Sequence, residues 1–111
     1  MTKKPHISIV SPEYKGEKMV EQLVSRIIAS VTPITDNFEI ILVNDASPDN
    51  TWAEILRQCA LDKRVKGLNL SHNFGENYAI TAGMAYATGD WIIELDCDLQ
   101  NMPEDIPVLY K

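Results

Sequence analysis

The order of apolar segments constrains this chain more than any other feature of its sequence. Four short, nearly continuous apolar runs are separated by three longer segments in which apolar residues recur at helical spacing. The short runs predict strands, and the longer segments predict amphipathic helices. Strands that alternate with helices pair in parallel through right-handed crossovers. The sequence therefore predicts an α/β fold, an open and mostly parallel sheet with flanking helices.

The four strands are expected at residues 6–10, 38–43, 65–70 and from Trp91 onward. We expect the first strand to end at Ser11-Pro12, because proline cannot donate a hydrogen bond to a sheet ladder. The second strand is apolar on both faces, which is typical of a sheet that is covered on both sides.

Three helices are expected between the strands, at about residues 17–31, after a turn at 47–50, and at 77–87. The first has an apolar stripe made of Met19, Val20, Leu23, Val24, Ile27, Ile28 and Val31. The second has one apolar face made of Trp52, Ile55, Leu56, Cys59 and Ala60. The third, which we expect Gly89 to end, has a stripe that would permit close packing on the sheet, made of Ala79, Ala82, Gly83 and Tyr86.

Composition excludes several classes of protein. The 111 residues suffice for one domain, and a hydrophobic share of 45% with 23% charged residues is that of a globular chain. A net charge of −6 argues against a nucleic-acid partner, which requires clustered Lys and Arg. No apolar run reaches the ~18–20 residues that span a bilayer, and the first residues lack the apolar segment of a signal peptide. Cys59 and Cys97 lack metal-site spacing and are expected to be free thiols. We expect a cytoplasmic location.

The fourth strand runs into two aspartates, Asp96 and Asp98. Alternate residues of an extended chain point to the same side, so the two carboxylates would lie roughly 6–7 Å apart. Like charges at that separation repel each other unless a cation lies nearby. Hard oxygen ligands suit Mg²⁺ or Mn²⁺, which usually also bind the phosphate oxygens of a substrate. The pair predicts a metal-bridged nucleotide site, with a turn carrying solvated acids as the alternative.

Polar clusters follow every expected strand. They are residues 11–14, 44–47, 71–75 and 96–98. The carboxyl ends of parallel strands meet at one edge of the sheet, where open α/β sheets bind their ligands. Four clusters at one edge therefore indicate a binding site more strongly than any single motif.

These loops also carry a family resemblance. The quoted motifs are Pro12-Glu13-Tyr14, Val43-Asn44-Asp45-Ala46-Ser47-Pro48-Asp49-Asn50-Thr51, Asn73-Phe74-Gly75 with Ala82-Gly83, and Asp96-Cys97-Asp98-Leu99-Gln100 with Pro103-Glu104. In this order and spacing they resemble glycosyltransferase family 2, in its polyprenyl-phosphate (dolichol-phosphate-mannose-synthase-like) branch. The likeness covers essentially the whole chain.

The resemblance implies the GT-A, nucleotide-diphospho-sugar transferase fold and a metal-dependent transfer with inversion. It implies a UDP- or GDP-linked donor, Mg²⁺ or Mn²⁺, and a polyprenyl phosphate or glycan acceptor. The family's general base usually lies in the second half of the domain, so no catalytic base is assigned, and residues 1–111 are expected to be the donor-binding part. Membrane association, at the cytoplasmic face, would come from parts outside this chain.

The resemblance also assigns nucleotide-binding residues. Pro12 and Tyr14 would shape the base pocket, with the aromatic ring as a stacking face. Asp45 would accept a hydrogen bond from the ring N–H of uracil or guanine. The alternative for Asp45 is helix or turn capping, a role that we assign instead to Asp49 or Asn50. Ser47 is expected to support the turn.

The remaining assignments concern the diphosphate, the ribose and the metal. The residues Asn73 and Gly75 would pass close to the diphosphate, where glycine permits backbone approach. The main metal ligand would be Asp98, with Asp96 near the ribose or a metal-bound water and Gln100 near the metal shell or diphosphate.

Two positions depart from the family pattern. Relatives usually have a ribose-binding Glu where this chain has Gly16, and Glu17 would substitute only if the loop shifts by one residue. His72 stands where relatives often have Arg, and we expect it to be a solvated loop residue.

The sequence also bears on three rival hypotheses. A nicotinamide-binding domain would need Gly-x-Gly-x-x-Gly after the first strand, which is absent. A Mg²⁺-binding receiver domain for signalling would need an acidic pair after the first strand and a lone Asp after the third, but these loops are Ser11-Pro12 and Ser71-His72-Asn73. A nucleotide-binding module without catalysis stays open. Apolar residues near the end of the chain (Ile106, Val108 and Leu109) favour self-association if they are uncovered.

Overall fold

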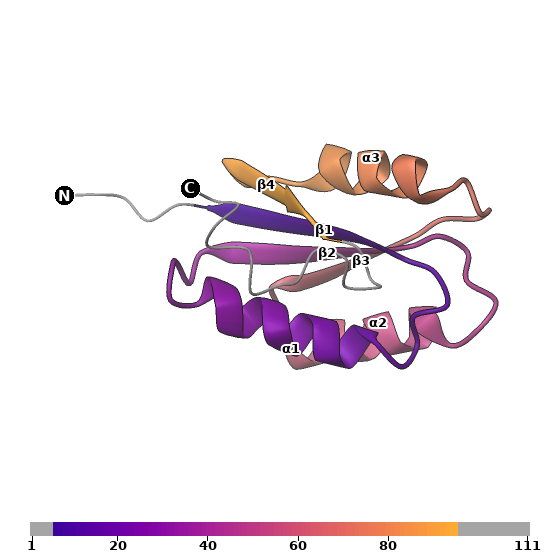
Figure 1. Ribbon diagram of the computed structural model, residues 1–111, viewed down its shortest axis with the longest axis horizontal. Helices are drawn as coiled ribbons and strands as arrows, with labels where there is room; N and C mark the ends of the chain where they lie inside the picture. Colours follow the sequence, from indigo (N-terminus) through magenta and orange to yellow (C-terminus); the bar gives the residue numbers. More distant parts are fainter. Residues whose placement is uncertain (1–5, 96–111) are drawn as a thin grey trace.

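The computed structural model describes residues 6–95 and contains the seven predicted elements in the predicted order. Figure 1 shows them along the chain. They are β1 (Ile7–Glu13), α1 (Val20–Val31), β2 (Phe38–Asn44), α2 (Thr51–Leu61), β3 (Val65–Asn69), α3 (Glu76–Tyr86) and β4 (Trp91–Glu94).

All four strands are parallel and form one sheet in the order β3-β2-β1-β4. In the register of this sheet, Ile9 of β1 lies between Ile40 of β2 and Ile93 of β4. The predicted parallel sheet is confirmed. Receiver domains have the strand order 2-1-3-4-5, in which the third strand lies beside the first. Here β4 occupies that place, so the receiver hypothesis is wrong.

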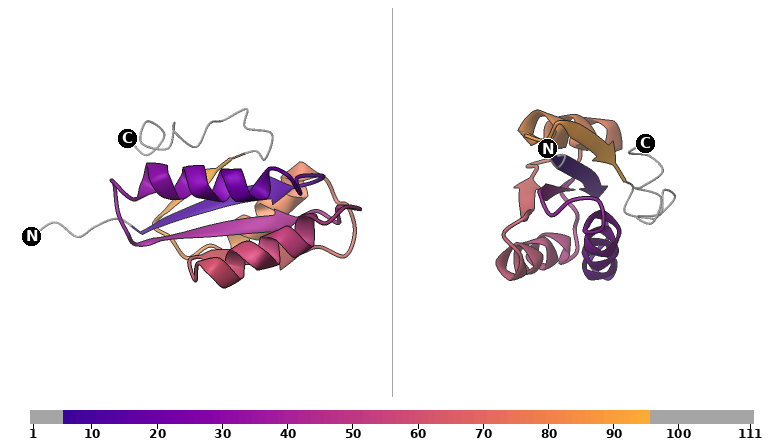
Figure 2. Two further views of the ribbon diagram at one scale, coloured as in Figure 1. Left: turned by 90° about the horizontal axis from the view of Figure 1, so that it is seen from below. Right: turned by 90° about the vertical axis from the view of Figure 1, so that its left-hand side faces the viewer.

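Helices cover both faces of the sheet, with α1 and α2 on one side and α3 on the other (Figure 2). Because side chains alternate along β2, Ile40 and Leu42 face α1 and α2 whereas Ile41 and Val43 face α3. The larger core lies on the α1–α2 side and includes Ile7, Ile9, Leu23, Ile27, Ile55 and Leu95. The smaller core lies under α3 and consists of Val10, Ile41, Val43 and Ala79, with Leu68, Leu70 and Ala87 packed against it.

The first strand does not end at Ser11-Pro12 as predicted, but continues to Glu13. The N–H and C=O groups of one residue point to the same side in a parallel ladder, and sides alternate along the strand. The carbonyl of Glu13 accepts from the N–H of Asp45, which follows β2, so Glu13 faces β2. The carbonyl of Val10 accepts from the N–H of Leu95, which follows β4, so Val10 faces β4. Pro12 therefore turns its missing N–H toward β4, and the β1–β2 ladder continues past it without loss. The prediction failed because it did not consider which neighbour would lose the bond.

Two helices differ from their predictions in extent or face. Helix α1 begins at Val20, because residues 17–19 form a tight turn in which the Met19 N–H donates to the carbonyl of Gly16. In α2, the buried line is Thr51, Ile55 and Gln58, and the predicted Leu56 is half-exposed. The tertiary contacts of α2 with β3, β2 and α1 cover a narrower stripe than the sequence pattern indicated.

Close packing of α3 on the sheet is confirmed at Ala79 and Gly83, which are buried, although Tyr86 is exposed. A Cβ atom at Gly83 would lie 2.4 Å from Cγ1 of Val10. Gly89 does not end the helix, since α3 ends at Tyr86. It lies instead against β1, where an added Cβ would come within 2.6 Å of the Ser8 nitrogen.

The structure also bears on the predictions about membrane spans and about the thiol of Cys59. No helix in residues 6–95 is long and apolar enough to cross a membrane. The thiol of Cys59 is free and partly buried, and this burial raises its pKa.

Candidate nucleotide-binding site

The candidate site lies at the carboxyl edge of the sheet. From β1 the chain passes through β2 to β3, and then returns across the sheet to place β4 on the other side of β1. Such a reversal creates a crevice beyond the strand ends, and open α/β sheets bind ligands there. The loops at residues 14–19, 45–50 and 70–75 follow β1, β2 and β3 and lie at this edge.

Asp45 is the centre of this edge. It follows β2 directly and is 4% exposed. Its Oδ1 accepts the Phe74 N–H at 2.9 Å, and its Oδ2 accepts the Gly75 N–H at 3.1 Å. The carboxylate thus joins the loop after β2 to the loop after β3. Each carboxylate oxygen can accept more than one hydrogen bond, so a further donor can still be bound.

Asn73 and Gly75 lie in the loop that Asp45 holds. Oδ1 of Asn73 accepts the Gly75 N–H at 3.2 Å, which closes a local turn. Gly75 has φ +95°, a conformation that glycine adopts without strain, and open space surrounds the position of a Cβ atom. A ligand could therefore approach the backbone here, as the sequence predicts for a diphosphate.

Pro12 and Tyr14 lie beside Asp45. The Asp45 N–H donates to the carbonyl of Glu13 at 3.0 Å, so the end of β1 and the loop after β2 are adjacent. Pro12 is buried at the end of the strand, whereas the Tyr14 ring is 42% exposed. The structure thus brings together Pro12, Tyr14, Asp45, Asn73 and Gly75.

Glu17 does not face this group of residues. Its Oε1 accepts the Asn50 N–H at 3.2 Å, so its carboxylate is turned toward the start of α2. A carboxylate accepts several hydrogen bonds, so this bond leaves acceptor capacity, and the role of ribose ligand stays a prediction. Gly16 is buried, and its N–H donates to Oγ1 of Thr51 at 3.0 Å.

Hydroxyl groups fix the loop after β1 to the loop after β2. The Lys15 N–H donates to Oγ of Ser47 at 2.8 Å, and Ser47 in turn donates to Asp49. Ser47 supports its turn as predicted, since its N–H donates to Asn44 and its hydroxyl donates to Asp49. Its partner Lys15 is 32 residues away in the sequence, and no local signal identified it.

Asp49, and not Asn50, caps α2. Its Oδ1 accepts the N–H of Thr51 at 3.1 Å and also the hydroxyls of Ser47 and Thr51. The side chain of Asn50 makes no capping bond. Burial alone would raise the pKa of the Asp49 carboxyl, but these hydrogen bonds outweigh it and lower the pKa below its usual value.

Two residues in these loops have a strained backbone. Lys15 and Ala46 both have φ +54°, in the left-handed region that non-glycine residues seldom adopt. Each conformation costs free energy and persists because the surrounding hydrogen bonds hold it, and such strain is frequent at functional sites.

An exposed aromatic cluster flanks the site. The rings of Phe74 and Tyr78 lie 4.5 Å apart, and His72 lies edge-on to Phe74 at 5.7 Å. His72 is exposed, as predicted for a solvated loop residue.

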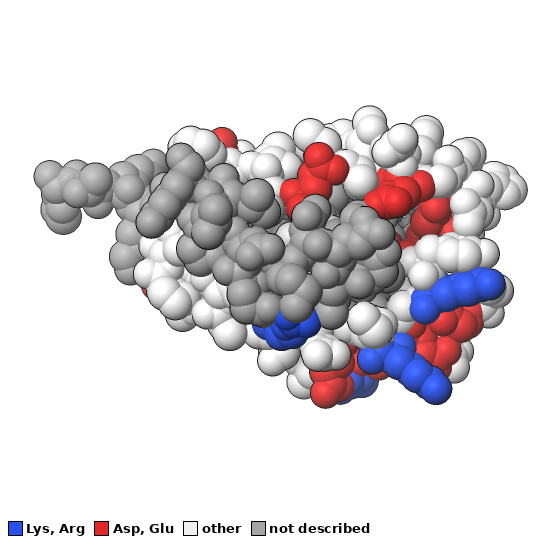
Figure 3. All heavy atoms as spheres, viewed as in Figure 1, with Lys and Arg blue, Asp and Glu red and all other residues white. Residues whose placement is uncertain are grey.

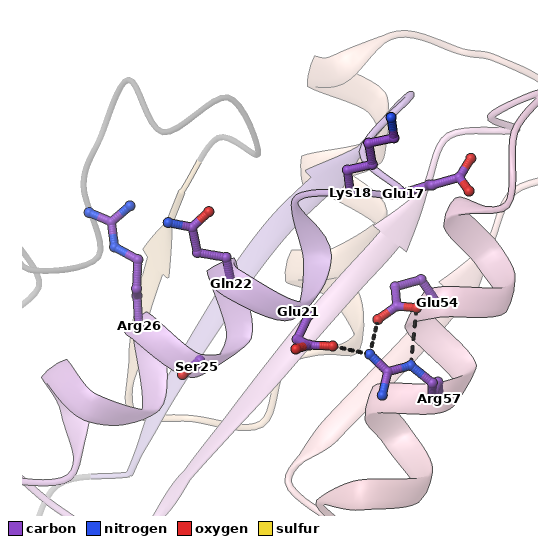
Figure 4. A pocket seen from close by; sticks show the side chains of 8 residues that line it. All are labelled: Glu17, Lys18, Glu21, Gln22, Ser25, Arg26, Glu54 and Arg57. Atoms are coloured by element: carbon purple, nitrogen blue, oxygen red, sulfur yellow. Dashed lines mark hydrogen bonds and ion pairs between the residues drawn. The ribbon is translucent and has the colours of Figure 1, made fainter.

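A groove of about 560 Å³ lies elsewhere, between α1 and α2 (Figure 4). Its lining is charged, and Arg57 of α2 bridges Glu54 of the same helix and Glu21 of α1. On the face shown in Figure 3, Lys and Arg lie beside Asp and Glu near these helices. We interpret the groove as a solvated helix–helix junction, because its lining is polar and the side chains of Arg57 and Glu21 are 49% and 69% exposed. Exposed ion pairs of this kind contribute little stability.

Three predicted residues, Asp96, Asp98 and Gln100, lie outside the described residues. Within residues 6–95, no group of three or more His, Cys, Asp or Glu side chains is arranged to hold a metal ion. The described chain ends at Leu95, whose N–H donates to the carbonyl of Val10 at 3.0 Å. The backbone is thus anchored at the carboxyl edge one residue before Asp96.

A sequence profile of glycosyl transferase family 2 matches residues 8–111, and the chain belongs to this family of glycosyltransferases. The predicted resemblance is confirmed. An uncharacterized glycosyltransferase of Synechocystis sp. is 41% identical over 98 residues, which are 88% of this chain and 31% of that protein. The undecaprenyl-phosphate 4-deoxy-4-formamido-L-arabinose transferase of Proteus mirabilis is 43% identical over 105 residues, 93% of this chain and 32% of that protein. The chain spans about a third of the length of these curated relatives.

Solved structures share the fold. A mannosyltransferase from Pyrobaculum calidifontis in complex with GDP-Man and Mn²⁺ superposes with a TM-score of 0.80 at 22% identity, over 94% of this chain and 30% of that one. The Staphylococcus aureus protein TarS in complex with UDP-GlcNAc gives 0.71 at 23% identity, over 84% of this chain and 26% of that one. At these identities the likeness establishes the fold, and the GT-A prediction is confirmed.

Proposed function

We propose that this chain binds the nucleoside diphosphate sugar donor of a metal-dependent, inverting glycosyltransferase whose acceptor is a polyprenyl phosphate. One observation carries the proposal. The Asp45 N–H donates to Glu13, and its carboxylate accepts from Phe74 and Gly75, so that these bonds gather the ends of β1, β2 and β3 at the reversal point of the sheet. Support for the acceptor class comes from relatives named as undecaprenyl-phosphate sugar transferases.

Each part of the edge would perform one task in donor binding. The Tyr14 ring would stack on the base, and Asp45 would accept a hydrogen bond from the base N–H. The exposed backbone around Gly75 would approach the diphosphate. Asp98, with Asp96 and Gln100, would hold Mg²⁺ or Mn²⁺, which supplies charge neutralisation of the diphosphate leaving group.

The test is a calorimetric titration of the chain with UDP and with GDP, each with and without Mn²⁺. We expect one nucleotide to bind, and Mn²⁺ to strengthen its binding through Asp98. In Asp98→Ala the metal enhancement should disappear while metal-free binding persists. Asp90→Asn, which removes a carboxylate at the opposite edge of the sheet, is the matched control and should bind as the unmutated chain does. Equal affinities with and without Mn²⁺ in the unmutated chain would refute the metal site.

A further inference from the structure

We propose that Asp45 is a positioning residue for the loop at residues 72–75, so that base recognition and diphosphate binding are coupled through one carboxylate. The inference deepens the proposed function and rests on it for the identity of the ligand.

The coupling follows from the geometry of the carboxylate. Both oxygens of Asp45 are used, one for the N–H of Phe74 and one for the N–H of Gly75, at 2.9 and 3.1 Å. Asp45 is 4% exposed, so water cannot easily replace it as an acceptor. These two bonds join positions that are 29 and 30 residues apart in the sequence. A base that donates to Asp45 therefore binds to the group that fixes the neighbouring loop.

The loop depends on this carboxylate for its conformation. Gly75 has φ +95° and no atoms around the position of a Cβ, so side-chain packing does not hold it in place. Its N–H is held by Asp45 and by Asn73. The Phe74 ring is 48% exposed and contacts His72 and Tyr78. Hydrogen bonds to Asp45 are accordingly the main connection between the tip of this loop and the sheet.

Asp45→Asn is the informative substitution. An amide has one oxygen acceptor, so either Phe74 or Gly75 would face an NH₂ donor instead of an acceptor. Asp90→Asn makes the same chemical change at an exposed residue at the amino edge of the sheet and serves as the control.

The first measurement needs no nucleotide. Chymotrypsin cleaves after exposed aromatic residues, and mass spectrometry separates cleavage after Phe74 from cleavage after Tyr86 at the end of α3. We expect Asp45→Asn to speed cleavage after Phe74 about tenfold. The loss of one hydrogen bond to a charged group raises the population of the open, cleavable loop by about this factor. Cleavage after Tyr86 should not change, and Asp90→Asn should change neither. An unchanged rate after Phe74, or an equal rise at both sites, would overturn the proposal.

The second measurement compares nucleotides with one and two phosphates. UMP and UDP, or GMP and GDP, are titrated against the unmutated chain, Asp45→Asn and Gly75→Ala. We expect Asp45→Asn to weaken diphosphate binding several-fold more than monophosphate binding. Gly75→Ala keeps the carboxylate but disfavours φ +95°, and it should reproduce this selective loss.

The two measurements separate the hypotheses. If Asp45 contacted only the base, both nucleotides would weaken equally in Asp45→Asn, and the coupling would be refuted. If the unmutated chain bound neither UDP nor GDP, the proposed function would fail, and the proteolysis result would still decide whether Asp45 positions the loop.

Discussion

Single residues in this chain act through partners that are distant in the sequence, and Glu39 is the clearest case. Although it carries a charge, Glu39 is only 3% exposed, and it lies in β2 on the sheet face that α3 covers. Its carboxylate accepts hydrogen bonds from Ser8 and Lys66, both at 2.6 Å, and from Thr88. Burial alone would raise the pKa of this carboxyl, but the hydrogen bonds outweigh it and lower the pKa from 4.5 to about 2. This charge is one of the groups that hold the loop between α3 and β4 to the sheet, beside the bond from the Gly89 N–H to Ser8.

The lowered pKa of Glu39 predicts an acid-dependent loss of stability. A carboxyl whose pKa is lower in the folded than in the unfolded state stabilises the fold above pH 4.5, and this contribution disappears as the pH falls toward 2. From that shift we expect the unfolding free energy to fall by about 3 kcal/mol over this pH range. Urea unfolding between pH 7 and pH 2 measures it. The Glu39→Gln variant should be less stable at pH 7, and its unfolding free energy should depend less on pH between 4.5 and 2.

Glu94→Gln is the matched control for Glu39→Gln. Glu94 is an exposed glutamate of β4, and its substitution should leave the acid profile as it is in the unmutated chain. A Glu39→Gln profile with the same slope as the unmutated chain would show that Glu39 does not carry the effect.

At the scale of elements, the start of α2 connects the loops of the candidate site. Asp49 caps the helix and accepts from Ser47, Ser47 accepts from Lys15, and Thr51 accepts from Gly16. The loop after β1, which carries Tyr14, is thus held by the start of α2, the third element after β1. Stability of the helix start and geometry of the site depend on the same hydrogen bonds.

A pair of substitutions tests which residue caps α2. Asp49→Ala removes the acceptor for the Thr51 N–H and should cost about 1–2 kcal/mol of unfolding free energy, as for other helix caps. Asn50→Ala should cost less than about 0.5 kcal/mol, because its side chain makes no capping bond. Urea unfolding followed by circular dichroism measures both. Equal losses, or a larger loss at Asn50, would contradict the assignment.

At the scale of the whole molecule, the sheet is a central layer between two cores. Ile40 and Ile41 are adjacent in β2 and fully buried, but they pack into different cores on opposite faces. Such burial on both faces explains why β2 lacks the polar alternation of a one-sided sheet. It also fixes the strand ends, and with them the loops of the site, relative to one another.

This arrangement predicts equal sensitivity on the two faces. Ile40→Ala and Ile41→Ala should each cost about 2–5 kcal/mol, the range for deleting buried methyl groups. Ile92→Ala, at a position of β4 that is 40% exposed, should cost clearly less. Unfolding free energies from urea titration compare the three. A small loss at Ile41 alone would mean that α3 does not cover the sheet.

The sequence by itself determined the fold class, the order of the seven elements and the edge where the polar loops meet. These follow from local patterns, namely apolar periodicity, proline and glycine positions, and the obligatory crossovers of parallel strands. The motifs also identified the family, which the profile match over residues 8–111 confirms. The roles of Asp96, Asp98 and Gln100 stay predictions, since these residues lie outside the described part of the chain.

Only the tertiary structure decided which groups hold the loops together. Pro12 continues a strand because its missing N–H faces the neighbour that ends first, and Glu17 accepts a hydrogen bond from the Asn50 N–H at the start of α2. Asp45 donates its N–H to the end of β1 and accepts two N–H groups from the loop after β3. Such bonds join residues about 30 positions apart through backbone N–H groups, which every residue except proline possesses. A backbone donor leaves no mark in the side-chain sequence, so its partner becomes known only when the chain has folded.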